Sequence, residues 1–286
     1  MTTTAAPRQP ATRLRLGRIG YINCYPVYGA IDRGIVAVDA DLVTGTPSEL
    51  NDLLAAGELD VSVVSAVEYA RNAPSYQLIP NLAISSDGPV RSVALFSKKR
   101  AHELGNCTIL VSASSRTSVE LLRLLSRDVW GIQPRLAEAR AEAADLDAVM
   151  ALPHDAILVI GDPALLLQAR NAYPFRYDLG EEWKKWTGLP FVFAVWAARR
   201  EMHRDDAVRI HHRLIEAKRW GLANLDLLAE EAAYRTGIGV PVCREYLSGL
   251  DYAFTYKHLE GLSSFFRRLT QRGLVTDGTL SFLSVA

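Results

Sequence analysis

YDLGEEWKKWTGLPFVFAVWAAR, residues 177–199, joins a short acidic and aromatic helix to a long apolar strand. The strand, predicted over Phe191 to Ala197, comes too late in the chain to belong to an ordinary βαβ repeat. The stretch therefore predicts a chain that returns from one lobe to another, with a cleft between the lobes.

Upstream of this stretch, short apolar runs alternate with helical patterns. In the first third of the chain, strands are expected at Arg15 to Tyr21, Val36 to Val43, Asp60 to Val64 and Arg91 to Ser97, and helices after Pro26, over 46–57 and over 66–71. From Asn106 onward a second set begins, with strands over 107–112 and 156–160 and helices over 119–127 and 164–170. This alternation predicts an α/β protein with mainly parallel sheets. Residues 204–222 form an amphipathic pattern that begins a mostly helical C-terminal region.

The connections near Ser97 and Pro190 enclose about a hundred residues that carry their own strands and helices. We therefore expect a disordered tail over 1–13, a discontinuous lobe 1 over 14–97 and 199–286, and lobe 2 over 98–198. Ligands of open α/β sheets bind beyond the carboxyl ends of the strands. The residues that follow strands are therefore the first candidates for a site in the cleft.

The composition excludes several classes of function. The 286 residues contain 32 Lys plus Arg and 32 Asp plus Glu, which argues against nucleic acid as the main partner. The three cysteines form no CxxC pair, so a reducing, cytoplasmic location fits best. No secretory signal and no apolar run long enough for a membrane span is visible. A monomer and a homodimer remain equally open.

The Ser112–Ser118 loop is the clearest candidate for an anion site. Ser114, Ser115 and Thr117 offer hydroxyls where the backbone N–H groups at the start of a helix are free. The alternative is ordinary N-capping, which Ser and Thr often provide. Ser65 has the same two interpretations, as the cap of the following AVEYAR helix or as an anion ligand.

Other candidates follow strands or interrupt them. Asn23 comes after the first strand, where its amide orients a substrate group or simply holds an Asx turn. Ser92 stands in an otherwise apolar strand and either bonds to backbone or faces the cleft. Arg91 and Arg116 are candidate partners for a carboxylate, although each also fits a solvated surface position. Asp162 fits the start of a helix, with a substrate-binding role as the alternative.

The usual cofactor signatures are missing from the sequence. The six histidines form no HxxxH or HxxE pattern, so no metal is expected. No GxGxxG, GxxxxGK[ST] or GxSxG motif occurs, so we expect no nucleotide and no cofactor.

Four segments resemble the MqnA family, the chorismate dehydratases of the futalosine route to menaquinone. They are RIGYINCYPVYGAI, PSELNDLLAAGELDVSVVSAVEYAR, SSDGPVRSVALFSK and DLGEEWKKWTGLPFVFAVWAAR, and they cover residues 18–200 in order. Ser65-Ala66 departs from the Ser-Ser expected before EYA, which puts the second hydroxyl there in doubt. The resemblance implies a two-lobed type II periplasmic-binding-protein fold used as a cytoplasmic enzyme. It also implies that Asn23 and Ser92 are catalytic and that the serine loop binds a substrate carboxylate.

The resemblance further implies elimination of water from chorismate, a dianion, to give 3-[(1-carboxyvinyl)oxy]benzoate. The candidate segments contain hydroxyl and amide donors but no convincing His, Lys or Glu base. We therefore hypothesise that a carboxylate of the substrate removes the proton, and that Asn23 and Ser92 orient the substrate and assist the departing hydroxyl.

Three other functions use the same architecture. A solute-binding protein is expected to carry a signal peptide, and a ligand-sensing regulator is expected to carry a helix-turn-helix. The sister enzyme of the pathway, 1,4-dihydroxy-6-naphthoate synthase, takes a larger substrate. The YINCYP turn, with no histidine in the candidate segments, favours the dehydratase.

Overall fold

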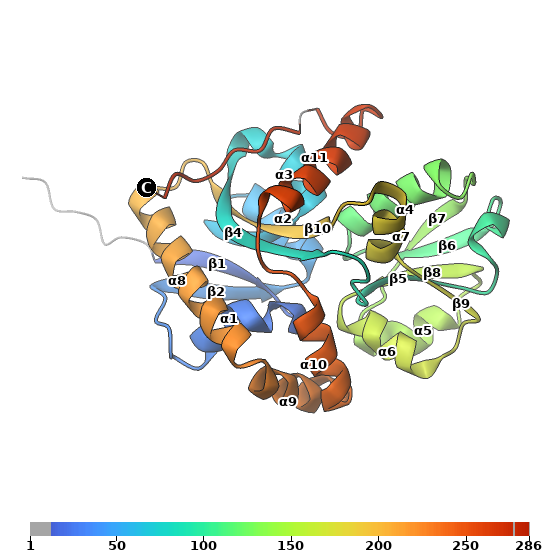
Figure 1. Ribbon diagram of the computed structural model, residues 1–286, viewed down its shortest axis with the longest axis horizontal. Coiled ribbons are helices and arrows are strands. Elements are labelled where there is room, and N and C mark those ends of the chain that lie inside the picture. The colour runs from blue at the N-terminus through green and yellow to red at the C-terminus, as the bar shows by residue number, and fades with distance from the viewer. Residues whose placement is uncertain (1–12, 277, 286) are drawn as a thin grey trace, which may run out of the picture.

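The computed structural model describes residues 13–276 and 278–285, and these form two lobes, each built around one five-stranded sheet (Figure 1). We call the part around the first sheet lobe 1 and the part around the second sheet lobe 2. The tail predicted over 1–13 lies outside the described residues, except for Arg13.

Ten strands make up the two sheets. The first sheet has the order β2-β1-β3-β10-β4, and the second has the order β7-β6-β8-β5-β9. The strands are β1 (Leu14–Ile19), β2 (Ala40–Gly45), β3 (Val61–Ser65), β4 (Tyr76–Ser86), β5 (Val93–Ser97), β6 (Thr108–Ser112), β7 (Arg135–Ala139), β8 (Ala156–Ile160), β9 (Phe175–Asp178) and β10 (Phe191–Arg199).

The described α-helices cover both faces of each sheet. They are α1 (Tyr25–Asp32), α2 (Pro47–Ala55), α3 (Ala66–Arg71), α4 (Thr117–Asp128), α5 (Leu146–Met150), α6 (Asp162–Arg170), α7 (Leu179–Thr187), α8 (Arg204–Ala223), α9 (Leu225–Thr236), α10 (Val240–Gly249) and α11 (Tyr256–Thr270). Figure 1 shows α4 and α7 on one side of the second sheet and α5 and α6 on the other.

Each sheet is mainly parallel, as predicted, but contains one strand that runs in the opposite direction. β1 pairs in parallel with β2 and β3, whereas β10 runs antiparallel to both β3 and β4. The second sheet repeats this arrangement, because β5 runs antiparallel to β8 and β9 beside the parallel strands β6, β7 and β8. In each sheet, the strand that crosses from the other lobe is the one that runs in the opposite direction.

The two crossing strands also differ from the expected lobe boundaries. β5 was expected in lobe 1 but pairs in the second sheet, and β10 was expected in lobe 2 but pairs in the first. β5 and β10 belong to different sheets and do not pair with each other. The chain crosses through the short segments 87–92 and 188–190.

β4 is a long strand that the sequence analysis did not predict. It spans Tyr76–Ser86 and pairs with β10 through two register shifts. Pro80 and Asn81 interrupt its apolar pattern, and Asn81 has a φ of 58°. Proline within an apolar run argues against a central strand, and β4 fits that rule because it is the edge strand of its sheet.

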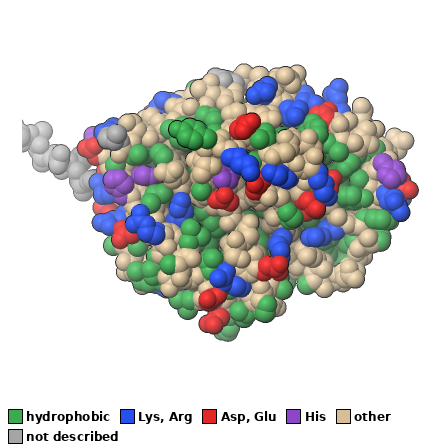
Figure 2. Space-filling view, in the orientation of Figure 1, with side chains coloured by type: hydrophobic (Ala, Val, Ile, Leu, Met, Phe, Trp, Pro, Cys, Tyr) green, Lys and Arg blue, Asp and Glu red, His purple; other side chains and the backbone are tan. Residues whose placement is uncertain are grey.

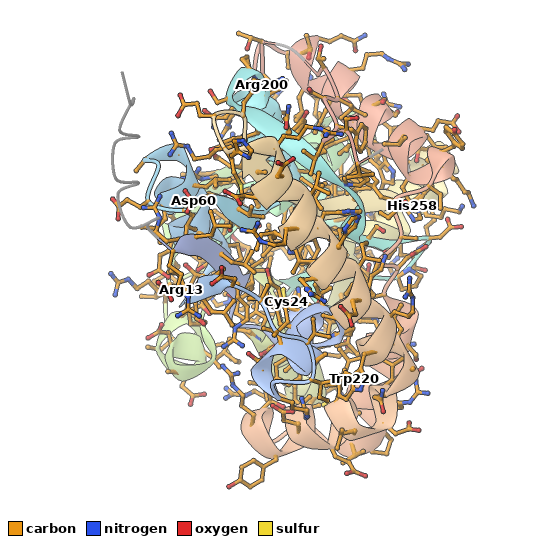
Figure 3. The ribbon with its side chains drawn as sticks, turned by 90° about the vertical axis from the view of Figure 1, so that its left-hand side faces the viewer. Arg13, Cys24, Asp60, Arg200, Trp220 and His258 are labelled. Carbon is orange, nitrogen blue, oxygen red and sulfur yellow. The ribbon has the colours of Figure 1, made fainter. Side chains whose placement is uncertain are left out.

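Helices α1 and α8 pack closely against each other in lobe 1. A Cβ on Gly221 of α8 would come within 2.0 Å of the carbonyl oxygen of Pro26 in α1, so only glycine fits at this crossing. Figure 3 views lobe 1 with α8 in front, Trp220 towards the C-terminal end of that helix and Cys24 at the start of α1. The close contact fixes the start of α1, where Asn23 lies.

A buried chain of hydrogen bonds ties α1 to the first sheet. Nε1 of Trp196 in β10 donates to the hydroxyl of Tyr28 at 3.0 Å, and that hydroxyl donates to the carbonyl of Gly17 at 2.8 Å. Both aromatic side chains are buried. Because buried polar groups are costly without partners, this chain holds α1, β1 and β10 in one arrangement.

The surface carries both signs of charge. Figure 2 shows Lys and Arg side chains interspersed with Asp and Glu side chains on one face, in keeping with the balanced composition. None of the helices in the described part of the chain is both long and apolar enough to cross a bilayer.

Candidate functional site

A small pocket lies between the two lobes, and we call it the cleft pocket. Its volume is about 60 Å³. Both lobes and the crossing segments line it, through Ile19, Tyr21, Asn23, Pro47, Ser65, Ile84, Val90, Ser92, Val93, Ser115, Arg116, Thr117, Ser118, Ile160, Gly161, Phe193 and Ala194. This volume holds about two water molecules. The cleft pocket as it stands is therefore too small for an organic ring.

Asn23 offers an unused amide to the cleft pocket. It lies in a short 3-10 turn, Ile22–Cys24, between β1 and α1. Its Oδ1 is buried and has no hydrogen-bond partner among the described residues. The backbone carbonyl of Asn23 accepts a hydrogen bond of 2.8 Å from the hydroxyl of Tyr252. The backbone is thus fixed while the side-chain amide stays available for a ligand.

Ser92 is held from both sides at the lobe junction. Its hydroxyl accepts a hydrogen bond of 2.8 Å from the hydroxyl of Tyr246 in α10. Its carbonyl accepts a hydrogen bond of 2.7 Å from the N–H of Gly161. Since the Tyr246 proton occupies one lone pair of Ser92 Oγ, the Ser92 hydroxyl hydrogen is left to donate elsewhere.

The backbone just before Ser92 is strained. Arg91 has a φ of 66°, which is unusual for a residue with a side chain. The carboxylate of Asp178 accepts hydrogen bonds from the N–H groups of Val90 at 3.0 Å and Arg91 at 2.6 Å. Burial raises the pKa of Asp178 despite these hydrogen bonds. Such strain persists only where the surroundings impose it, and here it fixes the direction of Ser92.

The serine loop and Ser65 line the cleft pocket from opposite lobes. Oγ of Ser115 accepts from the N–H of Ser118 at 3.3 Å, and Oγ1 of Thr117 accepts from the N–H of Val67 across the lobes at 3.0 Å. Oγ of Ser65 accepts from the N–H of Glu68 at 3.2 Å and so caps α3. The capping interpretation therefore holds for Ser65 and Ser115, and both residues also line the pocket.

Three of the predicted site residues do not line the cleft pocket. The hydroxyl of Ser114 donates to Glu142 at 2.5 Å. The guanidinium of Arg91 forms an ion pair of 2.6 Å with Glu245. Asp162 accepts a hydrogen bond of 3.0 Å from the N–H of Ile22 and lines a separate, outer groove. Of these three contacts, the one between Ile22 and Asp162 joins the two lobes, whereas Ser114 and Glu142 both belong to lobe 2.

The outer groove has a volume of about 500 Å³ and adjoins the cleft pocket at Tyr21. The hydroxyl of Tyr21 donates to Glu142 of lobe 2 at 2.9 Å. Burial and the neighbouring Glu142 carboxylate raise the pKa of Tyr21, so its hydroxyl stays protonated. Tyr21 and Glu142 thus form a contact across the mouth of the cleft pocket.

Gly161 makes this contact sterically possible. Its φ is 68°, and a Cβ there would come within 2.5 Å of the Tyr21 ring. Both the backbone conformation and the lack of space require glycine.

Asp162 has the most perturbed carboxyl group around the cleft. Burial raises its pKa from 3.8 to about 7, although the hydrogen bond from Ile22 lowers it. The carboxyl group therefore changes its charge near neutral pH while it accepts a hydrogen bond from the opposite lobe.

Among the residues that the structure describes, Arg116 is the one cation on the lining of the cleft pocket. It pairs with Glu68, whose side chain is buried, and with Asp52, and both partners belong to lobe 1. α4 begins directly after Arg116, so the positive end of its helix dipole lies at the cleft pocket. In this first turn the N–H groups of Ser118 and Glu120 are already bonded, to Ser115 and Arg116 respectively.

The supporting residues Tyr246 and Tyr252 were missed by sequence reasoning. Both are buried tyrosines of the C-terminal region, and each donates to a residue that lines the cleft pocket. Tyrosine hydroxyls need partners when buried, but nothing in the local sequence indicates which partner they have. The described residues contain no cluster of three or more His, Cys, Asp or Glu suited to a metal ion.

Comparison with known proteins shows which family the chain belongs to. The profile of the menaquinone biosynthesis family matches residues 14–271. The chain is 35% identical over 234 residues to the chorismate dehydratase of Thermus thermophilus, covering 77% of this chain and 83% of that protein.

Solved structures with low sequence identity share the architecture. A protein from Archaeoglobus fulgidus superposes with a TM-score of 0.78 at 19% identity, covering 92% of this chain and 98% of the other. The periplasmic aliphatic sulphonate binding protein of Escherichia coli superposes with a TM-score of 0.66 at 13% identity, covering 93% and 94%. The fold is therefore that of the periplasmic binding proteins, with the cleft pocket between its two lobes.

Proposed function

The chain belongs to the menaquinone biosynthesis family, and on this premise we propose that it is a chorismate dehydratase, a hydro-lyase that converts chorismate to 3-[(1-carboxyvinyl)oxy]benzoate. The similarity to the Thermus thermophilus enzyme carries the identity of the substrate. The lining of the cleft pocket supports the kind of catalysis that this reaction needs.

The cleft pocket suits a dianion that must be held by hydrogen bonds. The polar side of the lining consists of Arg116, the first turn of α4 and the hydroxyls of Ser115 and Thr117 from lobe 2, together with the hydroxyl of Ser65 from lobe 1. Because Arg116 already pairs with Glu68 and Asp52, this side offers hydrogen-bond donors rather than net positive charge. Ile84, Phe193 and Val93 offer apolar contacts for a six-membered ring. We assign carboxylate binding to the polar side and ring binding to the apolar side.

The reaction removes a proton from C3 and a hydroxyl from C4 of chorismate. The electron pair of the C3–H bond becomes the new ring double bond as the C4–O bond breaks, and the proton and hydroxyl leave as water. Because the product ring is aromatic, the reaction is strongly favourable. The protein therefore has to position the substrate and stabilise charge more than to supply strong acid or base.

We assign the role of base to a carboxylate of the substrate. Among the described residues that line the cleft pocket, the titratable side chains are Tyr21 and Arg116. Tyr21 has a raised pKa and Arg116 is a permanent cation, so neither takes up a proton near neutral pH. The alternative base is Asp162 in the outer groove, with its pKa of about 7.

Asn23 and Ser92 are the residues to which we assign catalytic roles. The free amide of Asn23 and the hydroxyl hydrogen of Ser92 are both available at the pocket. In this proposal they hold the substrate for proton transfer and donate to the C4 hydroxyl as it leaves. Lobe closure brings them together with Ser115 and Thr117, so substrate enclosure and assembly of the site are one event.

The deciding experiment is to mix the purified protein with chorismate and follow the benzoate chromophore, with mass spectrometry to identify the product. Formation of 3-[(1-carboxyvinyl)oxy]benzoate with multiple turnovers is the expected result. Binding of chorismate without turnover would instead support a solute-binding protein, and no interaction would refute the assignment.

The base is tested separately, with a chorismate analogue that lacks the enolpyruvyl carboxylate. We expect this analogue to bind but not to react. Normal turnover of the analogue would rule out the substrate carboxylate, and a further loss of activity in Asp162→Asn would then identify Asp162 as the base.

The proposed location is the cytoplasm. Cys24, Cys107 and Cys243 are free thiols, and two of them are buried. Burial raises the pKa of Cys24 to about 12, so its thiol is unreactive. A reducing compartment is consistent with these three thiols.

A further inference from the structure

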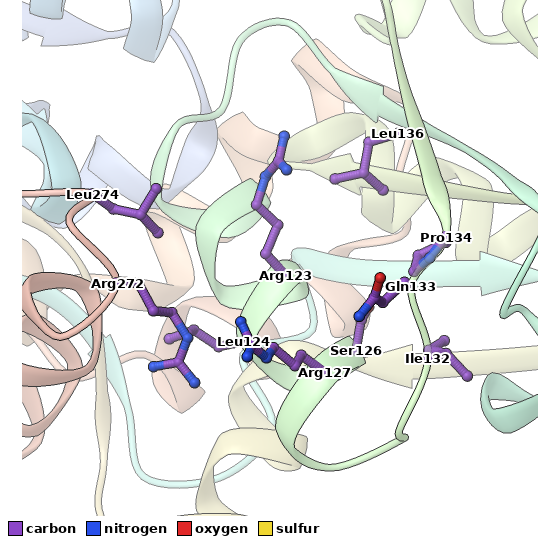
Figure 4. A pocket seen from close by; sticks show the side chains of 10 residues that line it. All are labelled: Arg123, Leu124, Ser126, Arg127, Ile132, Gln133, Pro134, Leu136, Arg272 and Leu274. Carbon is purple, nitrogen blue, oxygen red and sulfur yellow. The ribbon is translucent and has the colours of Figure 1, made fainter.

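A second open cavity of about 390 Å³ lies away from the cleft pocket, between the end of α4, the start of β7 and the segment after α11. We call it the arginine pocket (Figure 4). Arg123, Ser126, Arg127 and Gln133 from lobe 2 and Arg272 from the C-terminal region of lobe 1 provide its polar lining. It shares none of its lining residues with the cleft pocket.

The charge of the arginine pocket is positive. Arg272 pairs with Asp128, and Arg123 lies 3.7 Å from the carboxylate of Glu120. Arg127 has no hydrogen-bond or ion-pair partner within the described part of the chain. None of the lining residues is acidic. Figure 4 shows the side chains of Arg127 and Arg272 pointing toward each other. An unpartnered guanidinium beside a second one is suited to bind an oxyanion through paired hydrogen bonds.

Ser126 provides an independent indication of a ligand. It is 3% exposed, and its Oγ is buried without a hydrogen-bond partner among the described residues. A serine inside a helix usually bonds to the carbonyl one turn earlier or to solvent. An unpartnered buried hydroxyl destabilises the folded protein. A bound acceptor would offset this cost.

The rest of the lining is apolar. Leu124, Ile132, Leu136 and Leu274 line the arginine pocket next to the polar residues. This combination fits a small anion with an apolar body better than it fits a bare inorganic ion.

We propose that the arginine pocket binds a small organic oxyanion, a carboxylate or a phosphate ester on an apolar body. Arg127 holds the oxyanion from lobe 2, and Arg272 holds it from lobe 1 (Figure 4). The ligand thus joins the two lobes at the far end of α4, the helix whose first turn lines the cleft pocket. This site is separate from the substrate site.

The test uses the full-length protein and measures binding of benzoate, phenyl phosphate, inorganic phosphate and benzyl alcohol by calorimetry. At least one of benzoate and phenyl phosphate should bind saturably, and the tighter of the two identifies the oxyanion. Inorganic phosphate should bind more weakly because it lacks the apolar body, and benzyl alcohol should not bind. Absence of saturable binding by both organic anions would overturn the proposal.

Two variants locate the binding. Arg127→Gln should weaken it about tenfold or more by removing a charge-assisted hydrogen bond. Ser126→Ala should weaken it as well, yet leave the ligand-free protein equally or more stable, because it removes an unpartnered buried hydroxyl. The matched control is Arg213→Gln on the exposed face of α8, which should bind normally. Unchanged binding in Arg127→Gln would overturn the proposal.

A third variant separates the arginine pocket from the cleft. Asn23→Ala should retain the binding that Arg127→Gln loses, whether or not the protein turns over chorismate. Loss of that same binding in Asn23→Ala would assign it to the cleft and refute a second site.

Discussion

The hydroxyls of Tyr246 and Ser92 are joined by a hydrogen bond of 2.8 Å that spans 154 residues of sequence. Tyr246 is the donor, and both side chains are buried. The last third of the chain therefore determines the direction of a hydroxyl at the lobe junction. This makes Tyr246 a positioning residue that acts through Ser92.

Tyr246→Phe should lower kcat about five- to tenfold with little change in KM, because one hydrogen bond contributes about 1 kcal/mol. The matched control is Tyr28→Phe, which removes an equally buried hydroxyl that bonds to Gly17 away from the pocket. Tyr28→Phe should lose more stability in urea unfolding, because Nε1 of Trp196 also loses its acceptor, but it should keep its kcat. Equal kcat in the two variants would argue against the positioning role.

Asn23→Ala should lower kcat/KM about a hundredfold, the usual effect of removing one donor to developing charge. Its melting temperature should stay near that of the wild type, because the Asn23 amide oxygen has no protein partner to lose. Asn23→Asp should additionally raise KM, since a new carboxylate repels a dianion. Activity within threefold of wild type in Asn23→Ala would exclude this residue from catalysis.

Asp162→Asn should change how stability depends on pH. The pKa of Asp162 is raised from 3.8 to about 7, so between these values the folded state binds more protons than the unfolded state. The free energy of unfolding of the wild type therefore falls as pH rises through this window, by up to about 4 kcal/mol. Asp162→Asn has no carboxyl group to titrate, so its free energy of unfolding should not fall in this way. Compared with the wild type, the variant should therefore be more stable near pH 8 than at acid pH.

Urea unfolding at several pH values checks this expectation. The difference in free energy of unfolding between Asp162→Asn and wild type should grow from acid towards neutral pH and then level off. A difference that stays constant across the window would mean that the carboxyl group has an ordinary pKa.

Gly161→Ala should favour separated lobes. The added Cβ would collide with the Tyr21 ring across the cleft, and opening relieves the collision. We expect a larger radius of gyration in small-angle X-ray scattering and a higher KM. Gly34→Ala is the control, because Gly34 has a similar φ of 69° with no atom within 4 Å of the added Cβ. If both variants scatter alike, the Tyr21 contact does not limit closure.

Much of the fold could be predicted from local patterns. The apolar strands β3 and β8 and the amphipathic helix α8 were expected within a residue or two of their observed bounds. β4 was missed because Pro80 and Asn81 interrupt its apolar pattern. It is stabilised by pairing with β10, which lies more than a hundred residues later in the sequence and so gives no local signal. The direction of β5 and β10, and the sheet that each of them joins, likewise depend on pairing with strands that are distant in the sequence.

The candidate site was predictable where residues directly follow strands. Asn23, Ser65, Ser115 and Thr117 all line the cleft pocket, as does Ser92. Their partners could not be predicted, since Tyr246, Tyr252 and Asp178 are far away in sequence and carry no motif. Ser114, Arg91 and Asp162 look like ligands in the sequence, but in the structure their partners are Glu142, Glu245 and Ile22.

The place of β10 in the first sheet has a consequence for synthesis on the ribosome. β10 lies between β3 and β4, so these two strands have no neighbour on that side until residues 191–199 emerge. The second sheet is complete by Asp178, from one continuous segment. Lobe 2 should therefore fold first, while the nascent lobe 1 exposes the open edge of β3 to aggregation and to chaperones.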